Sequence, residues 1–263
     1  MEQDLKKENR AGSPREHSDV IPGRNAVAEA LRAGRAVDSV LVARGNRSGT
    51  LGKIIAECRK LGIPVKEVDI KKLDFMCGVS AHQGVAAITA MHEYATVDDI
   101  FAAAQAKQEP PFIILCDELE DPHNLGAVLR TAEAAGAHGV IIPKRRSAGL
   151  TFTVAKTACG AVEYVPVARV GNLGAAIDEL KERGLWIYGA DMDGTPWCET
   201  DFSGPVGLVI GAEGKGVGRL IREKCDFIVS LPMRGHLESL NASVAAGVLM
   251  YEIARQRMGL RAK

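Results

Sequence analysis

Apolar positions in the first third of the chain follow two alternating patterns. Stretches with apolar residues three and four apart predict amphipathic helices, and short apolar runs between them predict strands. Gly34, Gly62 and Pro64 stand where elements should end, and Ser48 is placed to cap a helix. The pattern predicts a small α/β unit of about 75 residues. Its expected helices span residues 25–31, 51–61 and 70–76, and its expected strands span 39–43, 65–68 and 85–89.

Continuous apolar runs dominate the chain from residue 112 onward. A run without polar alternation is typical of a strand buried on both faces of a parallel sheet. These runs alternate with helical stretches, which predicts an open, mainly parallel sheet with helices on both faces. Ligands of such sheets lie beyond the carboxyl ends of the strands. The runs span residues 112–116, 139–142, 186–190, 207–210 and 227–231, and helices are expected at 125–135, 150–158, 172–183, 220–223 and 241–258.

These patterns divide the chain into four segments. Residues 1–18 are polar and charged with almost nothing to bury, which favours a disordered tail. Residues 19–91 form the small unit, and residues 111–263 form the larger one. Residues 92–110 connect them through a helix expected at 97–107, which ends before Pro110 and Pro111.

Composition narrows the possibilities further. The chain is 46% apolar and 25% charged, as in ordinary globular proteins, and its net charge is zero. A basic surface must therefore come from local clusters such as Lys144-Arg145-Arg146. The six cysteines lack metal-ligand spacing, so we expect reduced thiols and no metal site. Since the chain begins without an apolar signal core and contains no run of membrane-spanning length, we expect a cytoplasmic protein without membrane contact.

The loop after residues 112–116 carries the first candidate site residues. Asp121 and Asn124 both suit a helix start, and Gly126 permits close backbone approach. Arg130 follows Asn124 by six residues, nearly two helical turns, so both can share one helix face. Taken alone, the loop favours a capping Asn124 and a solvated Arg130.

A glycine-rich loop, Gly211-Ala-Glu-Gly-Lys-Gly-Val-Gly218, follows the strand expected at 207–210. The phosphate-binding P-loop requires Ser or Thr after Gly-Lys, where this chain has Gly216. The dinucleotide fingerprint fails as well, because its third glycine, Gly218, comes one place early. The loop therefore offers a backbone that a ligand can approach closely, with one carboxylate, Glu213, inside it.

The third loop joins the strand at 227–231 to the helix at 241–258. It contains Pro232 and Gly235, and either Ser239 or Asn241 can cap the helix. The positive end of the helix dipole favours an electron-rich ligand group there. Three loops with glycine or proline and few polar groups predict an apolar pocket, which suits an adenosine-like ligand better than a polyphosphate.

The three loops carry motifs that resemble the SpoU (TrmH) family of RNA 2′-O-methyltransferases. The motifs are Asp-Pro-x-Asn-x-Gly-x-x-x-Arg-Thr-Ala at 121–132, Ile-Gly-x-Glu-Gly-x-Gly at 210–216, and Leu-Pro-Met with Ser-Leu-Asn-x-Ser-Val-Ala within 231–245. The front unit looks like the RNA substrate-binding domain of that family, through residues 22–31 and 82–87. Residues 143–148 and 158–163 are similar to the bacterial 23S ribosomal RNA guanosine 2′-O-methyltransferase, whereas residues 234–238 are more charged than that subgroup.

The resemblance implies a SPOUT-type fold whose C-terminal domain contains a deep trefoil knot. It implies S-adenosyl-L-methionine as the cofactor, RNA as the substrate, and a homodimer whose subunits complete each other's sites. The residues that it implies for cofactor binding are Ile210, Gly211, Gly214, Leu231, Met233 and Leu240.

The implied reaction is methylation of a ribose 2′-oxygen, in a guanosine of 23S ribosomal RNA. The motif implies Arg130 as the central catalytic residue, and a guanidinium is better suited to stabilising an alkoxide or binding a phosphate than to acting as a base. His123 is interpreted as a substrate contact or a supporting residue. The residues expected to orient Arg130 and the ribose are Asn124, Glu213, Ser239 and Asn241.

Three alternative functions follow from the same residues. Methylation of transfer RNA is the first, although the simplest transfer-RNA enzymes of the family lack a front domain. An RNA-binding protein without catalysis is the second, and the intact polar residues of the motifs disfavour it. A nucleotide-dependent dehydrogenase is the third, and the broken dinucleotide fingerprint disfavours it.

Overall fold

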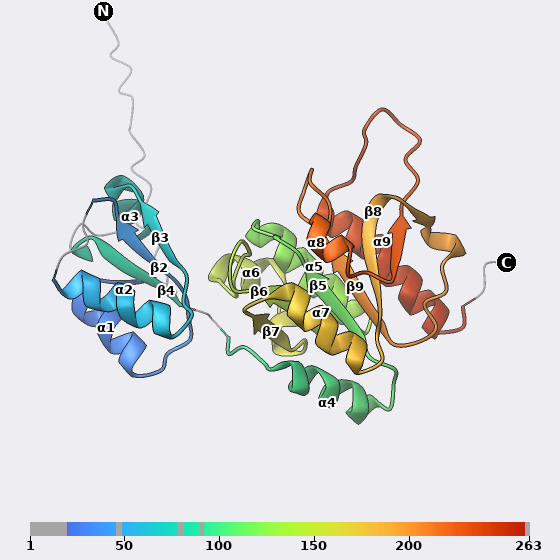
Figure 1. The fold of residues 1–263 in the computed structure, drawn as a ribbon, viewed down its shortest axis with the longest axis horizontal. Coiled ribbons are helices and arrows are strands. Elements are labelled where there is room, and N and C mark those ends of the chain that lie inside the picture. Colours follow the sequence, from blue (N-terminus) through green and yellow to red (C-terminus); the bar gives the residue numbers. More distant parts are fainter. Residues whose placement is uncertain (1–19, 46–48, 78–81, 90–91, 261–263) are drawn as a thin grey trace, which may run out of the picture.

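A computed structural model describes residues 20–45, 49–77, 82–89 and 92–260 of the protein (Figure 1). These residues form two sheets, one of four strands and one of six. The predicted tail at residues 1–18 and the predicted cap at Ser48 lie outside the described residues. Within the described ranges, no helix combines the length and the apolar character needed to cross a membrane.

The small sheet has the strand order β1-β4-β2-β3 and mixes parallel and antiparallel pairs. Helices α1 and α2 cover one face through Val27 and Leu51, and α3 covers the other through Leu73. The sequence pattern misses β1, because three residues ending in proline show no period. The elements are β1 (Val20–Pro22), α1 (Arg24–Arg32), β2 (Val37–Ala43), α2 (Thr50–Lys60), β3 (Val65–Val68), α3 (Ile70–Cys77) and β4 (Val85–Thr89).

The large sheet has the order β10-β8-β9-β5-β6-β7, and its strand pairs are parallel, as predicted. The sequence pattern misses β7, because Arg169 interrupts a very short apolar run. The trefoil knot stays a prediction of the resemblance. The strands are β5 (Phe112–Cys116), β6 (Gly139–Pro143), β7 (Val167–Val170), β8 (Trp186–Pro196), β9 (Val206–Ile210) and β10 (Phe227–Ser230).

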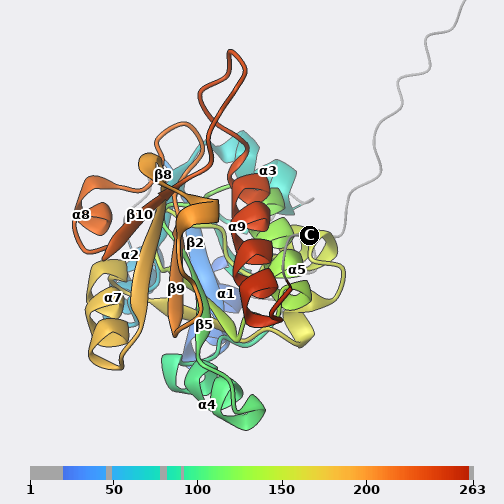
Figure 2. The same cartoon turned by 90° about the vertical axis from the view of Figure 1, so that its right-hand side faces the viewer.

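Helices cover both faces of the large sheet, and Figure 2 shows α7 and α9 on opposite sides of it. Because successive side chains of a strand face opposite ways, Phe112 packs with α5, α6 and α9, and Ile113 packs with α4 and α7. The connector helix α4 belongs to this unit, since its Ile100 is fully buried in the second core. The helices are α4 (Val97–Lys107), α5 (Pro122–Ala134), α6 (Phe152–Thr157), α7 (Leu173–Glu182), α8 (Arg219–Arg222) and α9 (Ala242–Arg257).

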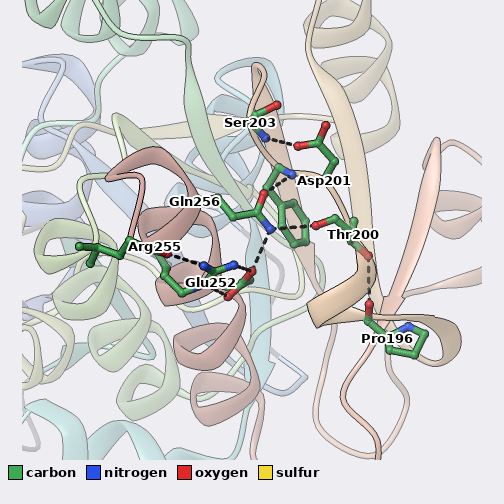
Figure 3. A network of polar contacts seen from close by, with 9 residues as sticks. Pro196, Thr200, Asp201, Ser203, Glu252, Arg255 and Gln256 are labelled. Atoms are coloured by element: carbon green, nitrogen blue, oxygen red, sulfur yellow. Dashed lines mark hydrogen bonds and ion pairs between the residues drawn. The ribbon is translucent and has the colours of Figure 1, made fainter. Parts of the chain in front are cut away.

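Polar contacts fix the C-terminal half of α9 to the segment that precedes β9 (Figure 3). Gln256 Nε2 donates to the carbonyl oxygen of Thr200 at 2.9 Å, and Gln256 Oε1 accepts from the backbone N–H of Phe202 at 2.8 Å. Arg257 donates to the carbonyl oxygen of Pro110 at 2.7 Å, just before β5. The C-terminal end of α9 is therefore anchored near the amino ends of β5 and β9, whereas its first residues lie at the carboxyl ends of the strands.

A buried polar cluster joins the two units. Arg169 of β7 donates to Asp38 of β2 twice, at 2.7 Å to Oδ1 and at 2.7 Å to the carbonyl oxygen. Tyr94 of the connector donates its hydroxyl hydrogen to the same carboxylate, and burial and the Asp38 charge raise the pKa of Tyr94. The side chains of Arg169 and Asp38 are 10% and 4% exposed, so this ion pair is desolvated. We call Asp38, Tyr94 and Arg169 the interdomain latch.

Candidate active site

A pocket of about 200 Å³ lies at the carboxyl ends of β9 and β10. Its walls are the backbone of the glycine-rich loop and apolar side chains of β10 and α9, such as Val229 and Leu249. This is the edge of the sheet where the sequence predicts a ligand. The six residues predicted for cofactor binding all line the pocket: Ile210, Gly211, Gly214, Leu231, Met233 and Leu240.

The glycine-rich loop folds back on itself as a tight hairpin. Ala212 and Gly216 exchange backbone hydrogen bonds of 3.1 and 3.0 Å, and Gly216 has a φ of +63°. A Cβ atom on Gly211 would lie 2.0 Å from the carbonyl carbon of Gly216, so a larger residue would force the hairpin open. The loop therefore presents mainly backbone to the pocket, as its composition predicts.

Asp117, directly after β5, anchors the glycine-rich loop from outside the pocket. Its Oδ2 accepts from the N–H of Gly218 at 2.8 Å, and its own N–H donates to the carbonyl oxygen of Ile210 at 2.8 Å. Burial raises the pKa of the Asp117 carboxyl above its ordinary value. The sequence does not single out Asp117, because other acidic residues follow it and nothing local marks the one that folds inward.

Three of the predicted catalytic residues meet at the start of α9. Asn241 Nδ2 donates to Asn124 Oδ1 at 2.9 Å and also to Glu213 Oε1. Asn241 Oδ1 accepts from the N–H of Ser243 at 3.0 Å, so Asn241 caps α9 and Ser239, the other candidate, does not. One amide thus caps a helix and joins the three loops. We call Asn124, Glu213 and Asn241 the polar cluster.

The start of α5 leaves Asn124 available for this cluster. Asp121 is the cap of α5, with Oδ1 accepting from the N–H of His123 at 2.9 Å, and Pro122 is the first helical residue. Asn124 lies within the first turn and is buried. The interpretation of Asn124 as a helix cap is therefore wrong, because Asp121 already occupies that position.

Arg130 makes its side-chain contact outside the polar cluster. It is exposed on α5, and its Nη1 donates to Cys159 Sγ at 3.5 Å. Cys159 has a φ of +51°, which few residues other than glycine adopt. Among the residues that the structure describes, no hydrogen bond joins Arg130 to Asn124, Glu213 or Asn241. The expected orientation of Arg130 by these three groups is absent from this arrangement.

Ser239 and Asp191 line the pocket, whereas His123 does not. Ser239 lies on its exposed rim, and His123 Nδ1 lies 3.4 Å from the hydroxyl of Thr157. Asp191, which the sequence pattern does not reveal, also lines the pocket and forms an ion pair with Arg222 at 2.5 Å. Across the described ranges, no three His, Cys, Asp or Glu side chains come together as a metal site.

Two family matches together span most of the chain. Residues 111–251 match the SpoU rRNA Methylase family, which is more than half of the sequence. The chain belongs to the SpoU family. Residues 20–95 of this SpoU protein match the RNA 2′-O ribose methyltransferase substrate-binding domain. The family and the RNA ribose methyltransferase activity predicted from the three loops are thereby confirmed.

Curated relatives of this SpoU protein extend over nearly its whole length. A putative TrmH family tRNA/rRNA methyltransferase, YacO of Bacillus subtilis, is 51% identical over 240 residues, covering 91% of this chain and 96% of the relative. A relative of the same description from Staphylococcus haemolyticus is 46% identical over 239 residues, covering 90% of this chain and 96% of its own.

Solved structures of SpoU proteins share the fold. The SpoU methyltransferase AviRb from Streptomyces viridochromogenes, in complex with the cofactor AdoMet, has a TM-score of 0.58 and 27% identity, covering 91% of this chain and 90% of its own. The A. aeolicus TrmH/SpoU tRNA modifying enzyme has a TM-score of 0.52 and 29% identity, covering 57% of this chain and 77% of its own. These likenesses confirm the predicted α/β fold class. The predicted cofactor, S-adenosyl-L-methionine, agrees with the ligand of AviRb.

Proposed function

We propose that this SpoU enzyme methylates the ribose 2′-oxygen of a guanosine in 23S ribosomal RNA, with S-adenosyl-L-methionine as the methyl donor, in the cytoplasm. The observation that carries the proposal is the polar cluster: Asn241 bridges Asn124 and Glu213 beside the pocket that the predicted cofactor residues line. The match to a ribose methyltransferase substrate-binding domain supports ribose as the target. The match to an rRNA methylase family supports ribosomal RNA.

The pocket has the chemistry that S-adenosylmethionine requires. When bound, this cofactor supplies an electrophilic methyl group on a positively charged sulfur. The glycine-rich backbone that lines the pocket allows close approach of a flat base, and Leu231 and Leu249 provide apolar surface. Glu213 brings negative charge to the pocket, which complements a cationic ligand, whereas Arg222 offsets the charge of Asp191.

Arg130 is the proposed stabiliser of negative charge on the ribose 2′-oxygen. A hydroxyl is a weak nucleophile until it loses its proton, so the site must favour charge on that oxygen. A guanidinium remains protonated in proteins and presents several donors in a fixed plane. The exposed position of Arg130 lets RNA reach it. The polar cluster is proposed to hold the ribose, with Ser239 contacting it from the rim.

The proposed division of labour follows the sequence. We assign RNA substrate binding to residues 19–91 and methyl transfer to residues 111–263, with residues 92–110 as the linker and residues 1–18 as a tail.

We also propose a homodimer that forms through α9. Val244, Val248 and Tyr251 share one helical stripe and are 52%, 38% and 54% exposed, which is unusual for an apolar stripe without a partner. A second copy on this stripe would lie close to Asn241.

Labelled S-adenosylmethionine, incubated with the enzyme and either ribosomal RNA or transfer RNA, tests the function. We expect label on a ribose of 23S ribosomal RNA, located by mapping the modified nucleotide. Arg130→Ala should lower kcat by about 10²–10³-fold while cofactor affinity stays unchanged. Turnover near that of the wild type would contradict the role of Arg130, and label in neither RNA would contradict the proposed function.

Transfer RNA is the second candidate substrate. The Bacillus and Staphylococcus relatives are both named putative tRNA/rRNA methyltransferases, which supports transfer RNA as a candidate substrate. Against it, the A. aeolicus tRNA modifying enzyme covers 57% of this chain, so a large part of the chain has no counterpart there. Label in transfer RNA alone would decide for this candidate.

A further inference from the structure

A basic cleft lies between the two units. This interdomain cleft has a volume of about 740 Å³ and runs between α2 and β3 on one side and the loop after β6 on the other. A second cavity shares Lys66 with it and extends toward β2 and the start of α5. The cations that line the two cavities outside the latch are Arg59, Lys66 and Lys72 of the small unit, and Lys144, Arg145 and Arg146 of the large unit.

Several of these cations are available to an anion. Arg59, Lys66 and Arg145 are exposed, and within the described part of the chain none of them forms an ion pair. Arg146 differs, because Glu118 accepts from it at 2.7 Å. Of the two exposed arginines in the basic triplet, Arg145 is therefore the one that is available to an anion.

Few carboxylates offset this charge. Glu67 and Glu120 line the two cavities, and Asp38 is already bound by Arg169. The chain as a whole has a net charge of zero, so the positive excess is local to the interdomain cleft. A local excess between two low-dielectric walls concentrates the field that attracts an anion.

The interdomain latch fixes the two walls relative to each other. The carbonyl oxygen of Lys144 accepts from Arg169 Nη2 at 3.3 Å, so the latch reaches the first residue of the basic triplet. A Cβ atom on Gly149 would lie 2.2 Å from Asp38 Oδ2, which shows how closely the units pack there. Cations held in a fixed relation bind a polyanion with a smaller entropic cost.

The loop between β5 and α5 links the lining of the cleft to the active site. Glu120 and Pro122 line the second cavity. Asn124 follows Pro122 by two residues and bonds to Asn241 in the polar cluster. A strand in the cleft can thus follow one short loop to the pocket.

We propose that the interdomain cleft binds the phosphodiester backbone of the RNA strand that flanks the methylated nucleotide. This inference rests on the proposed function and adds the path of the substrate. Arg and Lys side chains match phosphate groups, and contacts to phosphates position a nucleic acid without reading its bases. Because the walls belong to different units, an RNA in this cleft contacts both.

A triple variant, Arg59→Ala, Lys66→Ala and Arg145→Ala, tests the cleft in the full chain. The control triple, Lys53→Ala, Lys107→Ala and Arg219→Ala, removes the same number of exposed cations elsewhere. Affinity for transcribed 23S ribosomal RNA is measured between 50 and 200 mM KCl, chosen as roughly the range where phosphate contacts dominate. Removing three contacts to a single strand should lower the slope of log affinity against log salt by about 2. Affinity for S-adenosylmethionine should not change in either variant.

The possible outcomes test the cleft proposal and the proposed function separately. If the wild type methylates RNA and the cleft triple keeps the wild-type slope and affinity, the cleft proposal is wrong and the proposed function stands. If polyglutamate competes for the cleft as well as RNA does, the site recognises acidic protein and the cleft proposal is again wrong. If the wild type neither binds nor methylates RNA, the proposed function fails and the cleft proposal fails with it.

Discussion

The cofactor pocket and the interdomain cleft differ in how the chain builds them. The pocket consists of backbone and apolar side chains from loops that each follow a strand of one sheet. The cleft consists of long charged side chains that belong to separate elements of two units. The pocket is therefore shaped by local loop geometry, whereas the cleft depends on how the units are held together.

Because of this difference, the pocket and the cleft should tolerate amino-acid substitutions to different degrees. A change in the pocket disturbs backbone that packs at van der Waals distance, as around Gly211. A change of one cation in the cleft alters charge without disturbing packing, since Lys66 and Arg145 are exposed. We expect cofactor binding to be sensitive to single substitutions and RNA binding to respond in small additive steps.

The largest expected effect comes from breaking the interdomain latch. Arg169→Met should weaken the coupling between the units by about 3–5 kcal/mol, because it leaves the buried Asp38 carboxylate without its cation. Both tryptophans, Trp186 and Trp197, lie in the large unit, so their fluorescence reports that unit alone, whereas circular dichroism reports both. In urea, the circular dichroism change of the variant should begin before its fluorescence change.

Arg183→Met is the matched control for the latch. Arg183 forms ion pairs with Asp98 and Glu179 but is 34% exposed and lies within the large unit. It should cost at most about 1 kcal/mol and leave the two transitions coincident. Coincident transitions in Arg169→Met would show that the latch does not couple the units.

The second effect breaks the pocket without touching the cleft. Gly211→Ala should destabilise the protein by about 1–3 kcal/mol, because the new methyl group meets the backbone at Gly216. Cofactor affinity, measured by calorimetry, should fall more than about tenfold. Gly235→Ala is the control, since its Cβ has open space around it and should change neither quantity. Equal cofactor affinity in both variants would argue against the pocket.

The third effect separates the two roles of Asn241. Asn241→Ser keeps a side chain that can cap α9 but removes the bonds to Asn124 and Glu213. Stability should fall by about 1 kcal/mol and kcat by roughly tenfold. Asn241→Ala removes the cap as well and should cost about 1 kcal/mol more. Full turnover in Asn241→Ser would show that the polar cluster is only structural.

The smallest effect concerns Asp117 and pH. Burial raises the pKa of Asp117, so the folded state favours the protonated carboxyl. The stability that this group contributes is present below its ordinary pKa of about 3.9 and is lost as the pH rises through the raised value. Asp117→Asn cannot ionise and keeps an acceptor for the N–H of Gly218. In urea, the free energy of unfolding of the variant should rise relative to that of the wild type between pH 4 and pH 7. A difference that stays constant with pH would contradict the raised pKa of Asp117.

The pocket could be predicted from sequence because its residues follow strands in recognisable loops. Leu231 ends an apolar run, and Gly211 and Met233 stand one and two residues after such a run. The order of strands in a parallel sheet brings such positions to one edge. The motifs also supplied Asn124 and Asn241, although Asn124 alone looked like a helix cap.

Contacts between distant elements could not be predicted in the same way. Cys159 reaches Arg130, and Asp117 reaches Gly218, through packing that no local pattern encodes. The sequence pattern misses β7 because Arg169 places a charged residue in a short strand. The Arg169 side chain is buried because Asp38 of the other unit binds it. Positions that break a local rule are often the ones that serve a long-range contact.

The anchor at the end of α9 has a consequence for the order of folding. Arg257 bonds to the carbonyl oxygens of Pro110 and Pro111, which precede it by 147 and 146 residues. Contacts of such sequence separation form late, because a long segment of chain must be closed before they are made. The cap at Asn241 docks with the same helix, so the pocket should acquire its last wall in the final folding step. Cofactor binding during refolding would then report the completion of the fold.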